Sequence, residues 1–217
     1  MSSSRTDKVE VASKPQGSGT SRGPANARPV DITNYLLARS NELAQTWSTE
    51  ICGRDLGQGT GFDGMVGRFM AQLTSLLPWL LGPHSAHIQP LWDRTAELFG
   101  VMAAKRGLAA GEVIEEFQIL RDLLIRTLFR DPPPEGSLSL RDTLRINRIV
   151  DRGVTLASVG HTDAMFFQYL EGPEAPGQAS PDMIVREADM QLALVEAELA
   201  QIVEVTPLDT AAVAPGN

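Results

Sequence analysis

The stretch LRDTLRINRIVDRGVTLASVGHTDAMFFQY, residues 140–169, decides the fold class of this chain. With VMAAKRGLAAGEVIEEFQILRDLLIRTLF, residues 101–129, it repeats apolar side chains at spacings of three and four. Such spacing collects these side chains on one face of an α-helix, and no segment alternates apolar and polar residues for long enough to form a strand. The sequence therefore predicts an all-α fold, a helical bundle of five to six helices.

Six helical segments follow from the apolar spacing and from the residues that interrupt it. Asp31 can cap the first helix, and Ser139 can cap the fifth. Gly82 and Gly107 are typical of helix ends, and Asp131 precedes three prolines that a helix cannot continue through. The expected helices span about residues 31–51, 63–81, 85–106, 110–130, 139–171 and 181–205.

The domain organisation follows from shifts in composition. Residues 1–29 are rich in Ser, Gly and Pro and carry five basic against two acidic side chains, so we expect a disordered tail. Residues 30–171 form the predicted helical domain, and residues 172–180 a Gly- and Pro-rich linker. An acidic amphipathic helix follows at 181–205, and residues 206–217 are expected to be a flexible tail.

Composition limits the class of partner and the compartment. The formal net charge of −8 argues against a nucleic-acid partner. The apolar run at residues 76–81 is too short to cross a membrane, and the first residues lack the apolar core of a secretory signal. Cys52 is the only cysteine, so no internal disulfide can form. We expect a cytoplasmic protein with no membrane partner.

Two stripes run along the fifth predicted helix, each at spacings of four, three and four. One consists of small residues, which allow another backbone to approach closely; it indicates tight packing on the fourth helix, a dimer interface or a ligand groove. The other is basic and indicates either a solvated face or a surface for an acidic partner. The small residues are Gly153, Ala157, Gly160 and Ala164, and the basic residues are Arg141, Arg145, Arg148 and Arg152.

Three charged residues lie within apolar helical surroundings: Glu116, Arg121 and Asp151. Charges in such surroundings are tolerated when they are paired. We therefore predict a polar brace between the fourth and fifth helices, in which Arg121 contacts Asp151 or Glu116.

The last predicted helix carries a narrow apolar seam formed by Leu192, Val195, Leu199 and Ile202. Such a helix has little reason to fold alone, so the seam covers the core or pairs with a second chain, and we favour pairing. Its outer face is a candidate contact for a partner protein, unless the arginines of the fifth helix neutralise it. The acids of this face are Glu187, Asp189, Glu196 and Glu198.

Chemical motifs point away from catalysis. His84, His87 and His161 have no neighbouring ligand pattern for a metal, and the chain has no nucleophile elbow or phosphate-binding loop. We expect a protein that is not an enzyme, with no metal and no cofactor. The alternative is a sensor that binds a small molecule, or haem through one histidine, in a cavity between helices.

Three stretches carry a resemblance to a known family. They are YLLAR at residues 35–39, followed by Glu42 and Trp47; AKRGL at 104–108 leading into EEFQILR at 115–121; and INRIVD at 146–151, closing with YLE at 169–171. Across residues 34–171 the chain resembles the N-terminal domain of RsbR/RsbRD-type stressosome co-antagonists, which also precedes some bacterial histidine kinases.

This resemblance implies a globin-like helical domain, usually without haem, that dimerises and senses or relays a signal. It assigns no catalytic residues. The 46 residues after Glu171 are too few for an anti-sigma-antagonist domain or a kinase. We therefore expect a homodimeric signalling or adaptor module whose output is carried by a partner protein.

Overall fold

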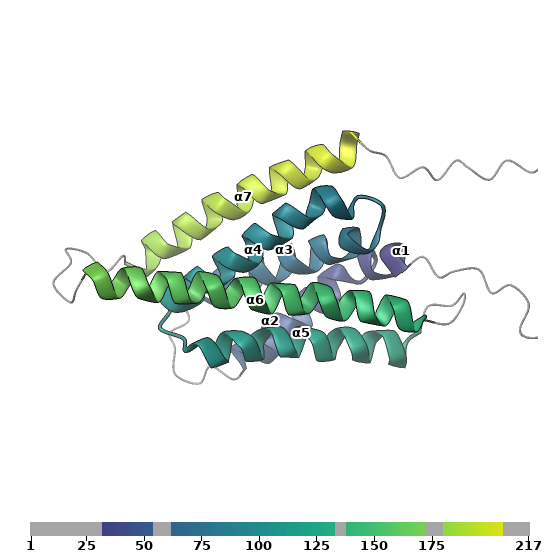
Figure 1. Cartoon of the computed structure of the whole chain (residues 1–217), viewed down its shortest axis with the longest axis horizontal. Coiled ribbons are helices and arrows are strands. Elements are labelled where there is room, and N and C mark those ends of the chain that lie inside the picture. The colour runs from purple at the N-terminus through teal and green to yellow at the C-terminus, as the bar shows by residue number, and fades with distance from the viewer. Residues whose placement is uncertain (1–31, 54–61, 133–137, 172–179, 206–217) are drawn as a thin grey trace, which may run out of the picture.

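The computed structural model describes residues 32–53, 62–132, 138–171 and 180–205 (Figure 1). These ranges form seven helices and contain no strand, so the prediction of an all-α protein is confirmed. No helix among them combines the length and the apolar character needed to cross a membrane. The helices are α1 (Ile32–Leu37), α2 (Ser40–Cys52), α3 (Asp63–Leu81), α4 (Ser85–Lys105), α5 (Ala110–Arg130), α6 (Leu140–Glu171) and α7 (Pro181–Val205).

The first predicted helix is in fact two helices, α1 and α2. The backbone breaks at Arg39, whose N–H bonds to the carbonyl of Leu36 at 3.1 Å, and Ser40 Oγ donates to Leu37 O at 3.0 Å. The sequence has no glycine or proline at this break. Tyr35 in α1 and Arg39 at the break instead contact Asp131 at the end of α5. The predicted cap, Asp31, lies outside the described residues.

The junction between α4 and α5 follows the predicted chemistry. Gly107 has a φ of +83°, a left-handed conformation that glycine adopts without steric cost. The N–H of Leu108 donates to Ala103 O at 3.1 Å and that of Gly107 to Ala104 O at 2.9 Å. These are the two hydrogen bonds of a Schellman cap. Glu112 then accepts a 2.7 Å bond from the N–H of Ala109 and begins α5.

A chain of edge-to-face aromatic rings crosses the centre of the core. Phe69 contacts Phe99, Phe99 contacts Phe117, and Phe117 contacts Trp47, with ring centroids 5.6, 5.7 and 5.9 Å apart. Trp47 Nε1 also donates a buried 2.7 Å hydrogen bond to the carbonyl of Glu116. This chain joins α2, α3, α4 and α5 through groups that are all satisfied or apolar.

The stripe of small residues on α6 packs inside the chain, chiefly against α4 and only at Gly153 against α5. Gly160 lies against the carbonyl of Glu97, and Ala157 lies against Gly100, a glycine that the sequence pattern had not singled out. Gly153 faces the ring of Phe117 on α5. A Cβ at these glycines would overlap the facing atoms, so the glycines permit the close approach of the two backbones.

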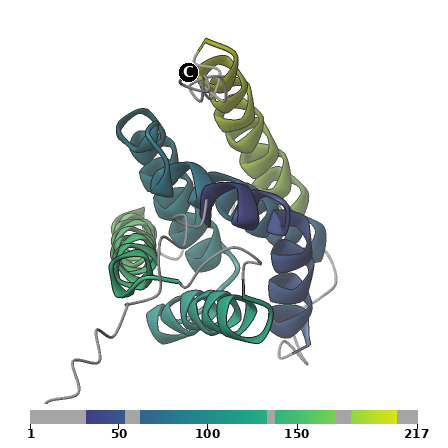
Figure 2. The ribbon, with the colours of Figure 1, turned by 90° about the vertical axis from the view of Figure 1, so that its right-hand side faces the viewer.

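The seam of α7 covers the core of its own chain, which makes the favoured prediction of pairing through this seam wrong. Ile184, Ala188, Leu192 and Val195 are buried in the common hydrophobic cluster, with Leu199 and Ile202 partly buried beside them. The helix packs on α3 and α4 because their apolar faces are already adjacent. In the end-on view α7 (yellow) lies on the opposite side of the bundle from α5 (Figure 2).

Candidate functional site

Of the two partners predicted for Arg121 in the polar brace, the structure shows Asp151, and Glu116 belongs to a second pair. Arg121 Nη2 contacts Asp151 Oδ1, linking α5 to α6, and the Asp151 side chain is 63% exposed. Glu116 does not take part in that contact. Its carboxylate faces Arg106 at the end of α4, with Nη1 and Oε1 3.7 Å apart and side chains that are 4% and 9% exposed. The buried pair therefore joins α4 to α5.

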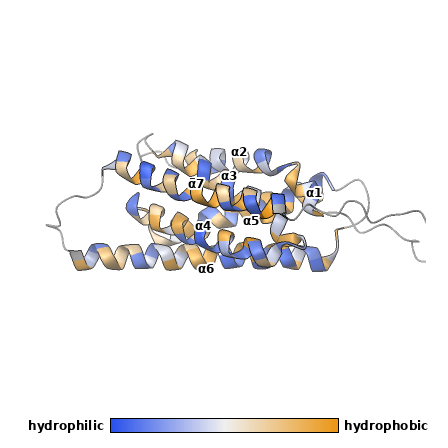
Figure 3. Ribbon diagram, turned by 90° about the horizontal axis from the view of Figure 1, so that it is seen from above, coloured by the Kyte–Doolittle hydropathy of each residue, from blue (hydrophilic) through white to orange (hydrophobic). Residues whose placement is uncertain are grey.

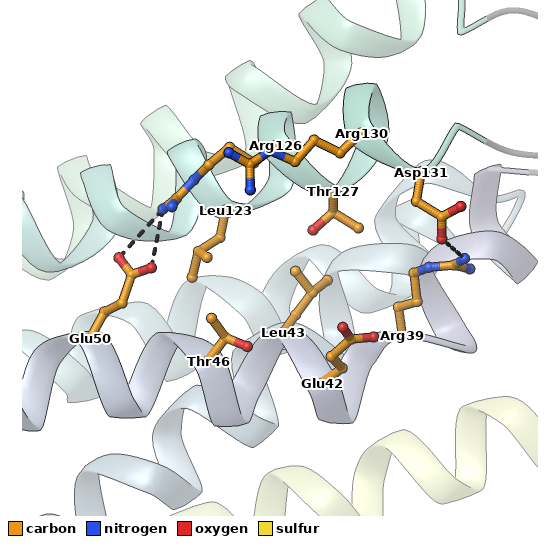
Figure 4. A pocket seen from close by; sticks show the side chains of 10 residues that line it. All are labelled: Arg39, Glu42, Leu43, Thr46, Glu50, Leu123, Arg126, Thr127, Arg130 and Asp131. Atoms are coloured by element: carbon orange, nitrogen blue, oxygen red, sulfur yellow. Dashed lines mark hydrogen bonds and ion pairs between the residues drawn. The ribbon is translucent and has the colours of Figure 1, made fainter.

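A groove of about 290 Å³ lies between α2 and α5 (Figure 4). An ion pair stands at each end: Arg126 with Glu50 at 3.2 Å, and Arg39 with Asp131. The lining contains guanidinium and carboxylate groups in equal number, with leucine and threonine between them. The lining residues are Arg39, Glu42, Leu43, Thr46, Glu50, Leu123, Arg126, Thr127, Arg130 and Asp131.

The Asp131 end of this groove is tied to α1. Tyr35 Oη donates to the carbonyls of Asp131 and Thr127, and the guanidinium of Arg39 lies 4.0 Å above the tyrosine ring. Burial raises the pKa of the Tyr35 hydroxyl, with a smaller opposing effect of Arg39. The groove is open and charged, whereas small-molecule sites are mostly enclosed and apolar. The ion pairs at its two ends connect α2 with α5.

Of the four arginines on α6, Arg152 has a structural role. Its Nε and Nη2 atoms each donate to a carboxylate oxygen of Asp93 on α4 at 2.6 Å, and Gln89 donates to the same carboxylate at 2.8 Å. Burial raises the pKa of the Asp93 carboxyl, but the hydrogen bonds from Arg152 and Gln89 outweigh it and leave that pKa below its ordinary value.

This lowered pKa gives a pH-dependent contribution to stability. A carboxyl with a lower pKa in the folded state stabilises the protein above its unfolded pKa, about 3.9, and loses that contribution as pH falls through the folded pKa. We expect Asp93→Asn to lower the free energy of unfolding at pH 7 by about 1–3 kcal/mol. Urea titrations should show the difference shrinking towards pH 3; an unchanged difference would contradict the assignment.

The other three arginines, Arg141, Arg145 and Arg148, form no ion pair with any described residue. They line a second hollow, of about 480 Å³, together with Leu140 and Leu144. The ion pairs of α7 are with residues of α3 and α4, so the alternative in which the α6 arginines neutralise its acids does not hold for the described residues.

Three of the four acids assigned to the outer face of α7 contact other cations instead. Glu187 Oε2 lies 2.7 Å from Lys105 Nζ on α4, Glu198 pairs with Arg94 on α4, and Asp189 with Arg68 on α3. Glu196 is exposed and remains a candidate for partner contact. The acidic face thus consists largely of ion pairs that orient α7 on α3 and α4.

The histidines occupy separate places in the fold. His84 is buried beside Trp79, His87 is exposed, and His161 Nε2 lies 2.7 Å from the carbonyl of Leu108. Within the described ranges no three potential ligands cluster in a way that could hold a metal ion. Cys52 is partly buried, with Ser48 Oγ 4.0 Å from its sulfur.

The most unusual surface is the carboxyl-terminal end of α6, which the sequence reasoning had not identified. All residues at 165–170 are exposed, and α6 extends beyond the other helices at this end (Figure 1). Five of them are large and apolar, spread over more than half of the helix circumference. They are Met165, Phe166, Phe167, Tyr169 and Leu170, with Tyr169 83% exposed. We call this surface the aromatic end of α6.

A signal for this surface was present in the sequence. The run MFFQYL has large apolar side chains with almost no polar spacing, where an amphipathic helix would alternate between its faces. The hydropathy-coloured view shows that the rest of α6 is mixed (Figure 3). No family model, curated protein or solved structure matches this chain.

Proposed function

We propose that this chain is a non-enzymatic signalling or adaptor module that acts through protein–protein contacts and forms a homodimer through the aromatic end of α6. The observation that carries the proposal is the exposure of Met165, Phe166, Phe167, Tyr169 and Leu170 on one projecting helix end. Contiguous exposed apolar surface of this kind marks an interaction site in folded proteins.

Charge favours a second copy as the occupant. Residues 164–170 carry no formal charge, although the chain as a whole has a net charge of −8. Two copies that approach through other surfaces experience like-charge repulsion, whereas the aromatic end can meet itself without that cost. Aromatic side chains also supply the large buried areas that dominate interface energies.

The globin-like domain suggested by the sequence resemblance fits this role, because such a domain transmits a signal by assembly and not by chemistry. In the proposed dimer, the two α6 helices cross at their aromatic ends. Helix α7 and the α2–α5 groove then stay outside the interface. A partner protein then carries the output. The groove is a less suitable ligand site, because its lining is charged and open to solvent.

Light scattering after size exclusion tests the proposal on the full chain. We expect a dimer at tens of micromolar. The dissociation constant of the dimer should be about 100-fold higher in Phe166→Asp/Tyr169→Asp, since each aspartate places a charge in an apolar contact. Both positions are exposed in the monomer, so circular dichroism should show an unchanged helical fold.

Phe129→Asp is the matched control for each of the two substitutions made singly, because it adds the same charge at an exposed aromatic near the end of α5. This variant should dimerise like the wild type. A wild-type chain that stays monomeric at high concentration, or an aromatic-end variant that dimerises as tightly as the control, would show that the proposal is wrong.

A further inference from the structure

The amino-terminal half of α6 presents a second surface of different chemistry, which we call the basic end. Arg141, Arg145 and Arg148 follow one another at four and three residues and therefore share one face of the helix. Leu140 and Leu144 are exposed on the same face, and the five residues line the open hollow of about 480 Å³.

The fold itself does not require these arginines. They make no ion pair with the described part of the chain, whereas Arg152, two turns further on, is fully engaged by Asp93. Ile146 and Val150 on the opposite face hold this half of α6 in the core. Cations near a helix amino terminus also oppose the helix dipole, so Arg141 costs helix stability where it stands.

Positive charge is concentrated around the same end of the molecule. Arg130 is exposed at the end of α5, which precedes α6 at that end (Figure 1). Asp142, the acid within the cluster, accepts a hydrogen bond from Ser139 Oγ, and Ser139 caps the helix by accepting a hydrogen bond from the N–H of Asp142.

We propose that the basic end of α6 binds an acidic helical segment of another protein. Carboxylates one helical turn apart match the spacing of the three guanidinium groups, which bind carboxylates through paired N–H donors. An apolar side chain between those carboxylates fills the hollow beside Leu140 and Leu144. This surface lies at the opposite end of α6 from the aromatic end, so the two can be occupied together.

Two other anionic partners fit the surface less well. A lipid bilayer is flat and leaves the hollow unfilled, while the remaining acidic surface of the chain is repelled by it. Nucleic acid carries a charge about every 1.7 Å, extends far past the three arginines and meets that same acidic surface. The five described residues that line the hollow include no aromatic side chain on which a base could stack.

Fluorescence anisotropy can test the proposal with the full-length protein. The probe is a labelled synthetic helix with three glutamates spaced as the arginines are and leucines between them; a second peptide has glutamine in place of glutamate. We expect the acidic probe to bind, the glutamine peptide to bind at least tenfold more weakly, and binding to weaken between about 50 and 500 mM NaCl.

Arg141→Gln/Arg145→Gln/Arg148→Gln should weaken binding by about tenfold or more, while the corresponding triple lysine variant retains part of it. The matched pair Arg148→Gln and Arg186→Gln removes one exposed arginine inside or outside the surface, neither of which forms an ion pair with a described residue, and only the former should matter. Each of these variants should still dimerise, which separates this result from the test of the aromatic end.

The proposal is overturned if the glutamine and glutamate peptides bind alike, or if the triple glutamine variant binds like the wild type. It is also overturned if vesicles of anionic lipid, or a labelled DNA duplex, bind the basic end more tightly than the acidic helix in the same buffer.

Discussion

Replacing Gly100 by alanine is expected to lower the free energy of unfolding by about 2–3 kcal/mol, although the same exchange stabilises most helices. The reason lies at the crossing of α4 and α6. A Cβ on Gly100 would overlap the backbone carbonyl of Ala157, which cannot move aside as a flexible side chain could. The two helices must separate, and the rows of small residues between them then lose contact.

The measurement is chemical denaturation monitored by helical circular dichroism, with Gly111→Ala as the matched control. Gly111 lies in α5 with no atom close to its missing Cβ, so alanine should raise stability by up to about 1 kcal/mol. Opposite signs for the two glycines are the expected outcome. If Gly100→Ala is as stable as the control, the two backbones do not approach as described.

Removal of the buried carboxylate by Glu116→Ala is expected to destabilise the fold by about 3–5 kcal/mol. Arg106 loses its contact with Glu116 Oε1, 3.7 Å away, in a site where the arginine side chain is only 4% exposed. The double variant Arg106→Met/Glu116→Leu should recover most of this loss, because apolar residues of similar volume often replace a buried pair without cost.

Urea denaturation of the two single variants and the double variant completes a thermodynamic cycle for this pair. Asp151→Asn serves as the comparison, since the Arg121–Asp151 contact is exposed and such pairs contribute about 0–1 kcal/mol. Equal losses for Glu116→Ala and Asp151→Asn would contradict a special role for the buried pair.

Local chemistry explains why most helix limits could be predicted from the sequence. The Gly82-Pro83 pair, Gly107 with its positive φ, and Ser139 with Asp142 act through their own backbone conformations or near neighbours. These effects do not depend on what the helix packs against. The predicted ranges 63–81, 110–130 and 181–205 are accordingly those of α3, α5 and α7.

Partner choice could not be predicted, because it depends on distances between segments far apart in the chain. Arg121 contacts Asp151, one of its two predicted partners, but Glu116, the other, faces Arg106 at the end of the preceding helix. The arginines of α6 and the acids of α7 were complementary in charge, but the packing of α7 on α3 and α4 gives those acids other cations.

The all-α class, the limits of most helices and the apolar face of each could be predicted from residue order, since helical periodicity and capping are local properties. The separation of α1 from α2, the contact of Gly100 with Ala157 and the packing of α7 on its own core became visible in the folded chain. The fold also left residues 165–170 outside that core. Periodicity shows that a face is apolar, whereas burial depends on which surface the folded chain brings against it.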